Sequence, residues 1–334
     1  MPIAPSTVVT TITQDAILPK VIDIVNSGNV LMTRLFSKAR PWPSGETLKF
    51  PVKVAASTAL GSYAGFDSFG TAQTNQRVMA QTNASQVYAT IAVSGIQRAL
   101  NEGDAKVIDL VTAEATGIAE DFKQDIGTQL YGDGTGNSSK DLLGIIAAVD
   151  DTTSVTTYLN ISRSTYTQWR ATRTAQSGSL SLANLASDFD AAQIGSDAPT
   201  LLVTTPAVFS IYEALLTPTV QHQLSFSGYD MVTVDGVVKG GQVAAGNGFR
   251  SLYFRGIPVV ADEKCTSGNI YTLNERHLFF YSLKPPYGEV KEGFSWTGWK
   301  VPTGQDAFVG QLLWYGQFIT DSPRHHARRT GVTS

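Results

Sequence analysis

The residue types that most often carry chemistry are few in this chain, which has only the histidines His222, His277, His325 and His326 and the single cysteine Cys265. Imidazole and thiolate groups serve as bases, nucleophiles and metal ligands. The histidines form no ligand pair at helical spacing, and the adjacent His325 and His326 point apart on any regular element. Cys265 has no histidine in its local segment, and a lone cysteine excludes an intramolecular disulfide and a cysteine-rich zinc site. We therefore expect no catalytic residues, no metal and no cofactor.

Two further patterns invite a catalytic or nucleotide-binding interpretation. The glycines of Gly132–Gly136 resemble a phosphate-binding loop, but such a loop follows a strand, whereas these follow a predicted helix, so we expect a helix stop and a turn. No Gly-x-Ser-x-Gly nucleophile elbow and no Walker pattern occur. The carboxylate pairs Asp150–Asp151 and Asp262–Glu263 are expected to lie in solvated turns.

Positive charge gathers at only one place, the segment that contains Arg324, Arg328 and Arg329. These side chains are candidates for a contact with nucleic-acid phosphate, although a solvated or subunit-contacting tail is the simpler interpretation. Tryptophans can stack on bases, but the apolar strand-like surroundings of Trp296, Trp299 and Trp314 favour core packing.

The composition sets the broad class. Charged residues make up 16% of the 334 residues, against about 25% in an average soluble domain. Hydrophobic residues reach 42%, enough for a sizeable core, and the length favours more than one lobe. The net charge of -3 argues against a dedicated reader of duplex DNA. The longest apolar run, 144–149, is far shorter than the ~18 residues of a membrane span, and we expect neither a secretory signal nor a membrane partner.

The first part of the chain predicts an arm and a long excursion. Residues 1–44 predict an arm with one short helix starting near Asp15 or Pro19. Apolar residues alternate over 47–54, which predicts a strand, and we expect its return over 87–93. The residues between carry few charges but include Tyr63, Phe66 and Phe69. Because a lone two-stranded excursion is marginal in water, these aromatic rings must pack on something.

The rest of the chain predicts one long helix followed by an α/β unit. Apolar residues recur every three or four positions over 101–131, as on one face of a helix. We expect further helices over 164–174 and 181–194 and from the capping Thr205 to Leu216. Predicted strands cover 199–205, 252–260, 269–273 and 278–283, and the apolar run 308–319 suits a strand buried on both faces.

This order of elements, an α+β arrangement, resembles the major capsid protein of tailed bacteriophages, the Hong Kong 97-type fold. Four local segments are similar to that family: Pro199–Pro206 before a helix, Phe254–Asp262 with its Gly-x-Pro-Val pattern, Ile270–Asn274, and Leu313–Gly316 near the end. Their order spans nearly the whole chain.

The resemblance implies an N-terminal arm over 1–44, an extended β-hairpin loop (E-loop) over 45–95, a peripheral domain with a long spine helix over 96–150 and 290–334, and an axial domain over 151–289. It also implies self-assembly as hexamers and pentamers into an icosahedral shell that encloses double-stranded DNA in the virion. Tyr63, Phe66 and Phe69 would then lie at a subunit interface. Assembly in the bacterial host cytoplasm and contact with a portal protein and with separate scaffolding or decoration proteins follow from the same resemblance.

Two variable features of the family bear on this chain. Some members cross-link neighbouring subunits through a loop lysine, but the lysines of this loop, Lys49 and Lys53, lie at its base, so we expect no such bond from the tip. Some members begin with a charged helical scaffolding segment, which is absent after Met1 here, so we expect any scaffold to be a separate protein. The alternatives are an encapsulin-like nanocompartment shell, an unrecognised α/β enzyme and another phage structural protein such as a tail component.

Overall fold

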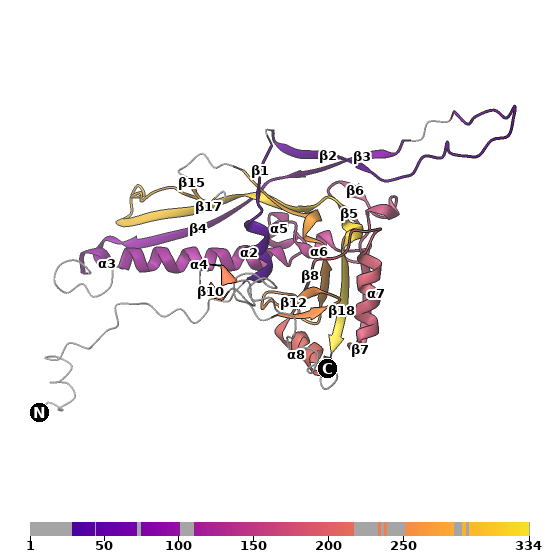
Figure 1. Ribbon diagram of the computed structural model, residues 1–334. Helices are drawn as coiled ribbons and strands as arrows, with labels where there is room; N and C mark the ends of the chain where they lie inside the picture. The colour runs from indigo at the N-terminus through magenta and orange to yellow at the C-terminus, as the bar shows by residue number, and fades with distance from the viewer. Residues whose placement is uncertain are drawn as a thin grey trace, which may run out of the picture.

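The structure is a computed structural model that describes residues 29–43, 45–71, 75–100, 110–216, 233–234, 237–238, 251–283, 289–291 and 294–333. The predicted helix near Asp15 or Pro19, residues 101–109 and His222 lie outside this part. Within it the strands form two six-stranded sheets and three two-stranded ladders. Figure 1 shows an elongated molecule, with a long sheet-and-helix arm at one end and a thin hairpin projecting from the other.

The first sheet forms the long arm. Its strand order is β1 (Arg40–Pro41), β14 (Leu278–Ser282), β17 (Ala307–Thr320), β16 (Phe294–Trp296) and β15 (Glu289–Lys291), and β4 (Ser85–Ser94) also pairs with β17. β4 runs antiparallel to β17 from Ser85↔Gly316 to Ser94↔Ala307. The predicted strand 308–319 is therefore confirmed, and burial is complete only over its last part, Gly316–Thr320.

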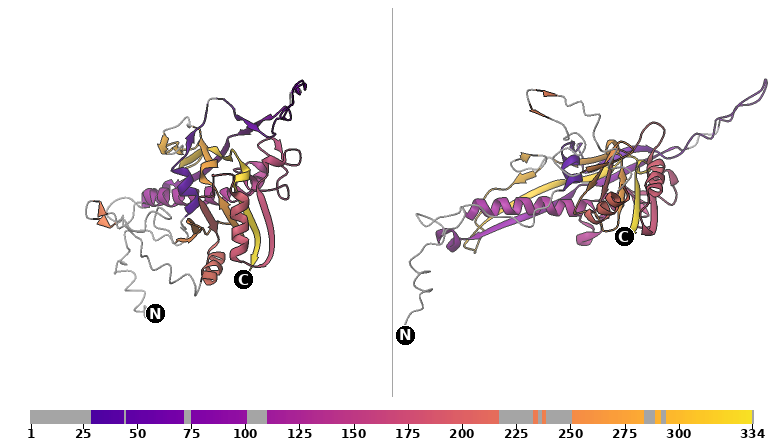
Figure 2. Two further views of the ribbon diagram at one scale, coloured as in Figure 1. Left: turned by 45° about the vertical axis from the view of Figure 1, so that its right-hand side comes forward. Right: turned by 60° about the horizontal axis from the view of Figure 1, so that its bottom comes forward.

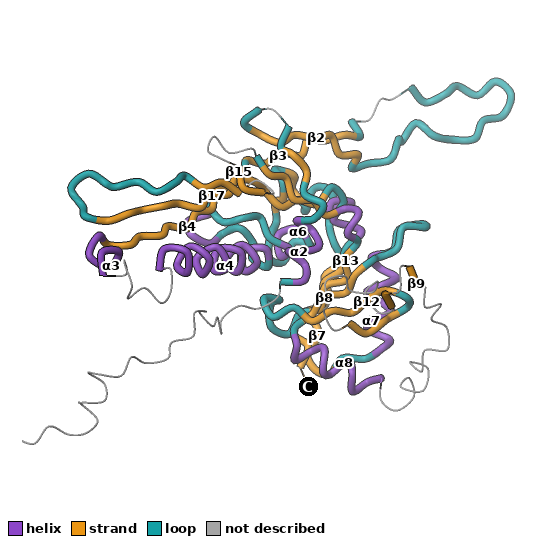
Figure 3. Tube along the Cα trace, turned by 60° about the vertical axis from the view of Figure 1, so that its left-hand side comes forward, coloured by secondary structure: helices purple, strands orange, loops and turns teal. Residues whose placement is uncertain are grey.

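Helix α4 (Leu110–Leu130) lies along β4 and confirms the long helix within the described residues (Figure 3). Phe122, Ile126 and Leu130 are buried, as the periodicity predicted. Gly127 has a clear packing reason, because a Cβ atom there would lie 2.1 Å from the Asn29 side chain, which precedes helix α2 (Val30–Phe36). Close approach of the two helices thus offsets the cost of a glycine inside a helix.

The projecting hairpin consists of β2 (Thr47–Lys53) and β3 (Arg77–Asn83), paired from Thr47↔Asn83 to Lys53↔Arg77. The prediction that 87–93 forms the return strand is wrong, because that segment lies in β4 and pairs with β17. The buried side chains of Val87, Ile91 and Val93 explain the difference: they belong to the core of the arm, whereas the hairpin buries little.

The second sheet forms the other lobe. Its strand order is β11 (Ser251–Phe254), β12 (Ile257–Ala261), β8 (Leu201–Thr204), β13 (Ile270–Leu273), β18 (Ala327–Thr333) and β7 (Thr172–Ser179). Helix α7 (Leu182–Ala192) packs on β7, β13 and β18, and α8 (Pro206–Leu216) packs on β12 (Figure 2). The predicted caps are confirmed, since Ser181 Oγ accepts from Asn184 N–H at 3.2 Å and Thr205 Oγ1 from Val208 N–H at 3.4 Å.

Two predicted elements of this lobe are wrong. The segment 252–260 is a hairpin and not one strand, because Arg255 and Gly256 adopt positive φ values of 49° and 83° and reverse the chain. The segment 164–174 is not a helix: a 3-10 turn, η1 (Thr167–Trp169), is followed by β7, which pairs with the last strand, β18. Tertiary pairing here overrides the local capping signal.

The sheets do not follow the predicted boundary between 289 and 290. β14, expected in the axial domain, belongs to the first sheet, and β18, expected in the peripheral domain, belongs to the second. Two of the crossings between the sheets run through short 3-10 helices, η2 (Glu275–His277) and η3 (Pro323–His325). β14 pairs with β17 in the first sheet, whereas β13 pairs with β18 in the second. The chain must therefore change sheets between β13 and β14 and again between β17 and β18.

The remaining elements are short. They are α3 (Gly95–Leu100), α5 (Gly136–Ser139), α6 (Ile145–Ala148), β5 (Thr157–Tyr158), β6 (Ile161–Ser162), β9 (Thr233–Val234) and β10 (Val237–Val238). One core runs beneath the first sheet and across to β8 and β13, and a smaller one lies beneath α8. No helix in the described part of the chain is long and apolar enough to cross a membrane.

Candidate functional site

Among the described residues, a run of exposed large apolar side chains lies on the projecting hairpin. The exposed fractions are 80% for Leu60, 64% for Tyr63, 107% for Phe66 and 69% for Phe69. The rings of Tyr63 and Phe69 meet edge to face with their centroids 4.9 Å apart. The Asp67 carboxylate accepts the Ala64 N–H at 2.9 Å and closes a local turn between them. The predicted interface residues therefore stand on one tip, with their apolar surface in solvent within the single subunit.

The position of this tip explains why its side chains are exposed. The ladder of the hairpin ends at Lys53↔Arg77, so the tip lies beyond the last backbone pairing between the two strands. Figure 2 shows that the hairpin points away from the rest of the subunit. Contiguous exposed apolar side chains are typical of a surface that contacts another molecule.

The expected basic cluster is not a surface cluster. Arg324 is exposed on η3, but Arg328 and Arg329 are buried in β18. Arg329 forms two hydrogen bonds to the Asp188 carboxylate, and Arg328 lies 5.9 Å above the ring of Tyr271. Arg328 and Arg329 are only 6% and 4% exposed, which does not favour the predicted contact with nucleic acid or a subunit at these two positions. For Arg324 it stays a prediction.

The tryptophans divide between core and surface. Trp314 is fully buried against Phe36, Phe280 and Phe294, in agreement with core packing. Trp296 and Trp299 form an edge-to-face pair with centroids 5.3 Å apart, and Trp299 remains partly exposed.

The glycine segment 132–136 ends a helix, as predicted. Helix α4 stops at Leu130, and the Gly132 carbonyl accepts the Ile146 N–H at 3.2 Å. The Asp133 carboxylate occupies the turn itself, accepting from Thr135 N–H and Oγ1 at 3.0 and 2.7 Å. Cys265 is buried, and burial raises the pKa of its thiol well above the ordinary range, so a thiolate nucleophile is disfavoured.

Of the four carboxylates predicted to lie in solvated turns, Asp150 and Asp262 are buried, whereas Asp151 is partly buried and Glu263 is exposed. Asp150 Oδ2 accepts the N–H groups of Ser154 and Val155 at 2.9 Å each. Asp262 accepts from Leu31 N–H at 3.2 Å and Lys264 N–H at 3.0 Å, and burial raises the pKa of its carboxyl. Both carboxylates thus satisfy backbone donors, and Asp262 holds the first turn of α2.

A buried arginine has a similar structural role that the sequence did not signal. The Arg163 guanidinium donates to the carbonyls of Val155 and Trp169 at 3.1 and 3.3 Å and to those of Ala147 and Ala148 at 2.7 and 2.9 Å. The last two are at the end of α6, where a helix has carbonyls without helical partners. No periodicity marks such a residue in a sequence.

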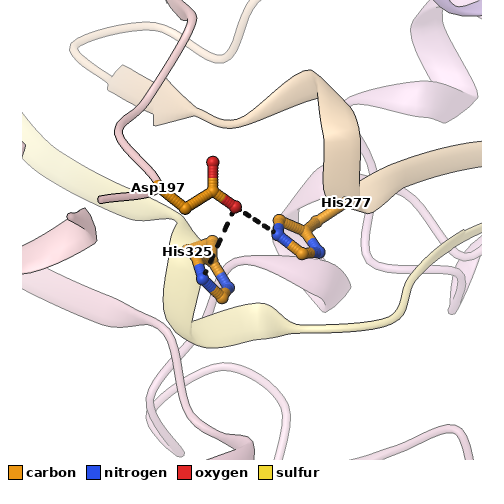
Figure 4. A group of neighbouring side chains, drawn as sticks. All are labelled: Asp197, His277 and His325. Atoms are coloured by element: carbon orange, nitrogen blue, oxygen red, sulfur yellow. Dashed lines mark hydrogen bonds and ion pairs between the residues drawn. The ribbon is translucent and has the colours of Figure 1, made fainter. Parts of the chain in front are cut away.

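A histidine cluster lies at the two crossings between the sheets (Figure 4). It comprises His277 at the end of η2, His325 at the end of η3, and Asp197 in the loop between α7 and β8. His277 Nε2 lies 2.9 Å from Asp197 Oδ2, and His325 Nε2 lies 3.9 Å from the same oxygen. The imidazoles stack with centroids 4.0 Å apart. The sequence missed this group because its members are far apart in the chain.

The charges around this cluster shift its pKa values in opposite directions. Hydrogen bonding to Asp321, 2.7 Å from Nδ1, raises the pKa of His277, and Asp197 adds to the effect. Burial and the neighbouring His277 lower the pKa of His325. The hydrogen bonds from His277 and Asn274 lower the pKa of Asp197. The adjacent His326 is fully buried, and burial lowers its pKa to about 3, so it stays neutral.

Neither a protein-family model nor a curated protein matches this chain, but solved structures match it from end to end. The capsid asymmetric unit of cyanophage A-1(L) is similar with a TM-score of 0.69 and 16% identity, covering 98% of this chain and 99% of that one. The structure of Mycobacterium phage Adephagia is similar with a TM-score of 0.54 and 12% identity, covering 100% of this chain and 99% of that one. The encapsulin SrpI complex from Synechococcus elongatus is similar with a TM-score of 0.56 and 13% identity, covering 99% of this chain and 96% of that one. The chain therefore has the Hong Kong 97-type capsid fold predicted from its sequence.

Proposed function

We propose that this protein is the major capsid protein of a tailed bacteriophage. The observation that carries the proposal is the hairpin tip, where Tyr63, Phe66 and Phe69 expose apolar surface that the subunit itself does not cover. A shell subunit surrounded by copies of itself would bury this surface on a neighbour. The end-to-end likeness to a cyanophage capsid and to other phage capsids supports the same function.

In this proposal the hairpin is the extended loop, the arm built on α4 and β17 is the peripheral domain, and the lobe around β8 and β13 is the axial domain. Subunits assemble as hexamers and pentamers into an icosahedral shell in the bacterial cytoplasm. A portal protein occupies one opening, and separate scaffolding or decoration proteins assist. The shell encloses double-stranded DNA without reading its sequence, which agrees with the net charge of -3.

Expression of the chain alone tests self-assembly. We expect megadalton particles or polymers in velocity sedimentation, visible as shells by negative-stain electron microscopy. A single small oligomer at every ionic strength and concentration would contradict the proposal. Boiled particles should run as monomers on a denaturing gel, because the hairpin lysines Lys49 and Lys53 lie within the β2 ladder and not on the tip beyond it.

A second candidate function is an encapsulin-type compartment, which the likeness to the SrpI encapsulin complex favours. Both functions require a closed shell and differ in the contents. Particles isolated from their natural source should release genome-length, nuclease-protected DNA if the chain is a phage capsid protein. Release of one enriched protein cargo without such DNA would establish the second function instead.

A further inference from the structure

We propose that Asp197, His277 and His325 bind a divalent transition-metal ion of the Zn²⁺ class, which fastens the two crossings between the sheets. This inference goes beyond the proposed shell function and does not depend on it. One carboxylate oxygen and two imidazole nitrogens, all within 4.8 Å of one another, make up the cluster (Figure 4). Oxygen and nitrogen donors of these kinds are common ligands of zinc.

The hydrogen bonds of the two rings leave the correct nitrogen atoms available. His277 Nδ1 lies 2.7 Å from Asp321 Oδ1, and His325 Nδ1 lies 2.8 Å from Ser322 Oγ. With a proton on each Nδ1, both Nε2 atoms offer a lone pair on the side of Asp197. Metal-bound histidines usually donate their other ring N–H to an oxygen in this way, which fixes the tautomer.

Two hydrogen bonds to Oδ1 fix the orientation of the Asp197 carboxylate. Asp197 Oδ1 accepts from Asn274 Nδ2 at 2.9 Å and from Arg276 Nη1 at 3.2 Å, which leaves Oδ2 facing the two imidazoles. An acceptor oxygen and an imidazole lone pair repel at the observed 2.9 Å unless a cation lies between them. That cation is either a proton on His277 Nε2 or a metal ion in its place.

The distances nearly suit an ion. Two ligand atoms each at about 2.0–2.1 Å from one metal lie about 2.9–3.4 Å apart, depending on the angle between them. The Asp197–His277 pair is already at 2.9 Å, and the Asp197–His325 pair must close from 3.9 Å. The stacked rings, inclined by 17°, must also splay so that both lone pairs meet one ion. His325 is the ring that turns, since the residue that orients it is Ser322 on the same turn.

The site is open enough for an ion to enter. The exposed fractions of the side chains are 27% for Asp197, 21% for His277 and 14% for His325. Three separate segments supply the ligands, namely the α7–β8 loop, η2 and η3. A bound ion would therefore hold together the places where the chain passes from one sheet to the other.

The test uses the untagged full chain, stripped with a chelator and then titrated with Zn²⁺ by calorimetry and with Co²⁺ by visible absorption. We expect one ion per chain, a cobalt d–d band and a higher unfolding temperature with Zn²⁺. His325→Gln and Asp197→Asn should each weaken binding at least tenfold, and Asp321→Asn about 10–100-fold. Arg324→Gln, exposed beside the cluster, is the matched control and should bind as the wild type does.

A readout on the unmodified chain keeps the test independent of variant folding. Zn²⁺ should protect His277 and His325 from diethylpyrocarbonate, as measured by peptide mass spectrometry. The proposal is overturned if stripped wild-type chain binds no Zn²⁺, if binding survives His325→Gln and Asp197→Asn, or if neither imidazole is protected. In these cases the cluster is a proton-linked ion pair, and the proposed shell function is unaffected.

Discussion

Arg329 and Asp188 form a bidentate ion pair that joins the last strand, β18, to helix α7. Arg329 Nε donates to Asp188 Oδ2 at 2.6 Å, and Nη2 donates to Oδ1 at 2.7 Å. Both side chains are almost completely buried, with 5% and 3% exposed. Burial raises the pKa of Asp188, while the bonds from Arg329 act in the opposite direction. An arginine of the predicted basic tail is thus part of the core of a lobe.

We therefore predict that Arg329→Ala destabilises the subunit strongly, by about 3–5 kcal/mol, because it leaves the Asp188 carboxylate buried without its partner. Arg324→Ala, on the exposed turn before it, should change the free energy of unfolding by no more than about 0.5 kcal/mol. Urea denaturation of both variants measures the difference. Equal stabilities for the two variants would contradict the core assignment of Arg329.

The buried face of α4 gives a second prediction. Phe122→Asp should prevent folding or cost more than about 4 kcal/mol, since it places a charge among apolar side chains. Lys123→Asp is the matched control on the exposed face of the same turn and should cost less than about 1 kcal/mol. Circular dichroism with thermal unfolding compares them. A wild-type melting temperature for Phe122→Asp would show that another face of the helix is buried.

A third prediction concerns pH and the pair between Arg34 on α2 and Glu275 on η2. The Glu275 carboxylate accepts from Arg34 Nε at 2.7 Å and Nη2 at 2.8 Å. Burial alone would raise the pKa of Glu275, but the hydrogen bonds and charge of Arg34 outweigh it and leave the pKa below its ordinary value. A carboxyl with a lowered folded-state pKa stabilises the fold above its unfolded pKa and loses this effect as the pH falls through the folded value.

Glu275→Gln should therefore cost about 1–3 kcal/mol at pH 7, and this difference from the wild type should shrink as the pH falls below about 4.5. Urea denaturation at several pH values between 7 and 3 measures it. Glu263→Gln, whose carboxylate is exposed, is the control and should show no comparable difference at any pH. A Glu275→Gln deficit that stays constant down to pH 3 would exclude the ionised pair as its source.

The hairpin tip gives the fourth prediction. Replacing Tyr63, Phe66 and Phe69 together by Ser should leave a soluble, folded subunit, because these rings pack on no core of their own. Shell assembly should fail or slow, since the replacement removes apolar contact area with a neighbour. Ser62→Ala with Ser68→Ala, on the same tip, is the control. Sedimentation and negative-stain microscopy compare yields, and normal shells from the triple variant would rule out an interface role.

Periodic segments of the sequence were predictable in detail. The alternation over 47–53, the helical stripe through Phe122 and Ile126, and the capping hydroxyls of Ser181 and Thr205 each reappear in the structure. These features depend on neighbours a few positions away, so local chemistry specifies them. The family resemblance then ordered the elements into a fold that the structure confirms.

Local sequence patterns could not predict which strands pair with one another over long distances in the chain. β3 and β4 follow one another and both suit a strand, and only the tertiary structure shows that β3 returns along β2 while β4 joins β17. Buried polar groups were missed for the same reason. Asp262, Arg163 and Arg329 look like surface residues in the sequence, and their partners lie in distant segments. The cluster of Asp197 and His277, 80 positions apart, is the clearest case.

The most direct test of the central claim is a cryo-electron-microscopy reconstruction of particles assembled from the expressed chain. The proposal predicts a closed icosahedral shell of hexamers and pentamers in which residues 60–69 of each copy are buried against an adjacent copy. A reconstruction in which Phe66 and its neighbours face solvent, or an expressed chain that forms no closed particle, would contradict it.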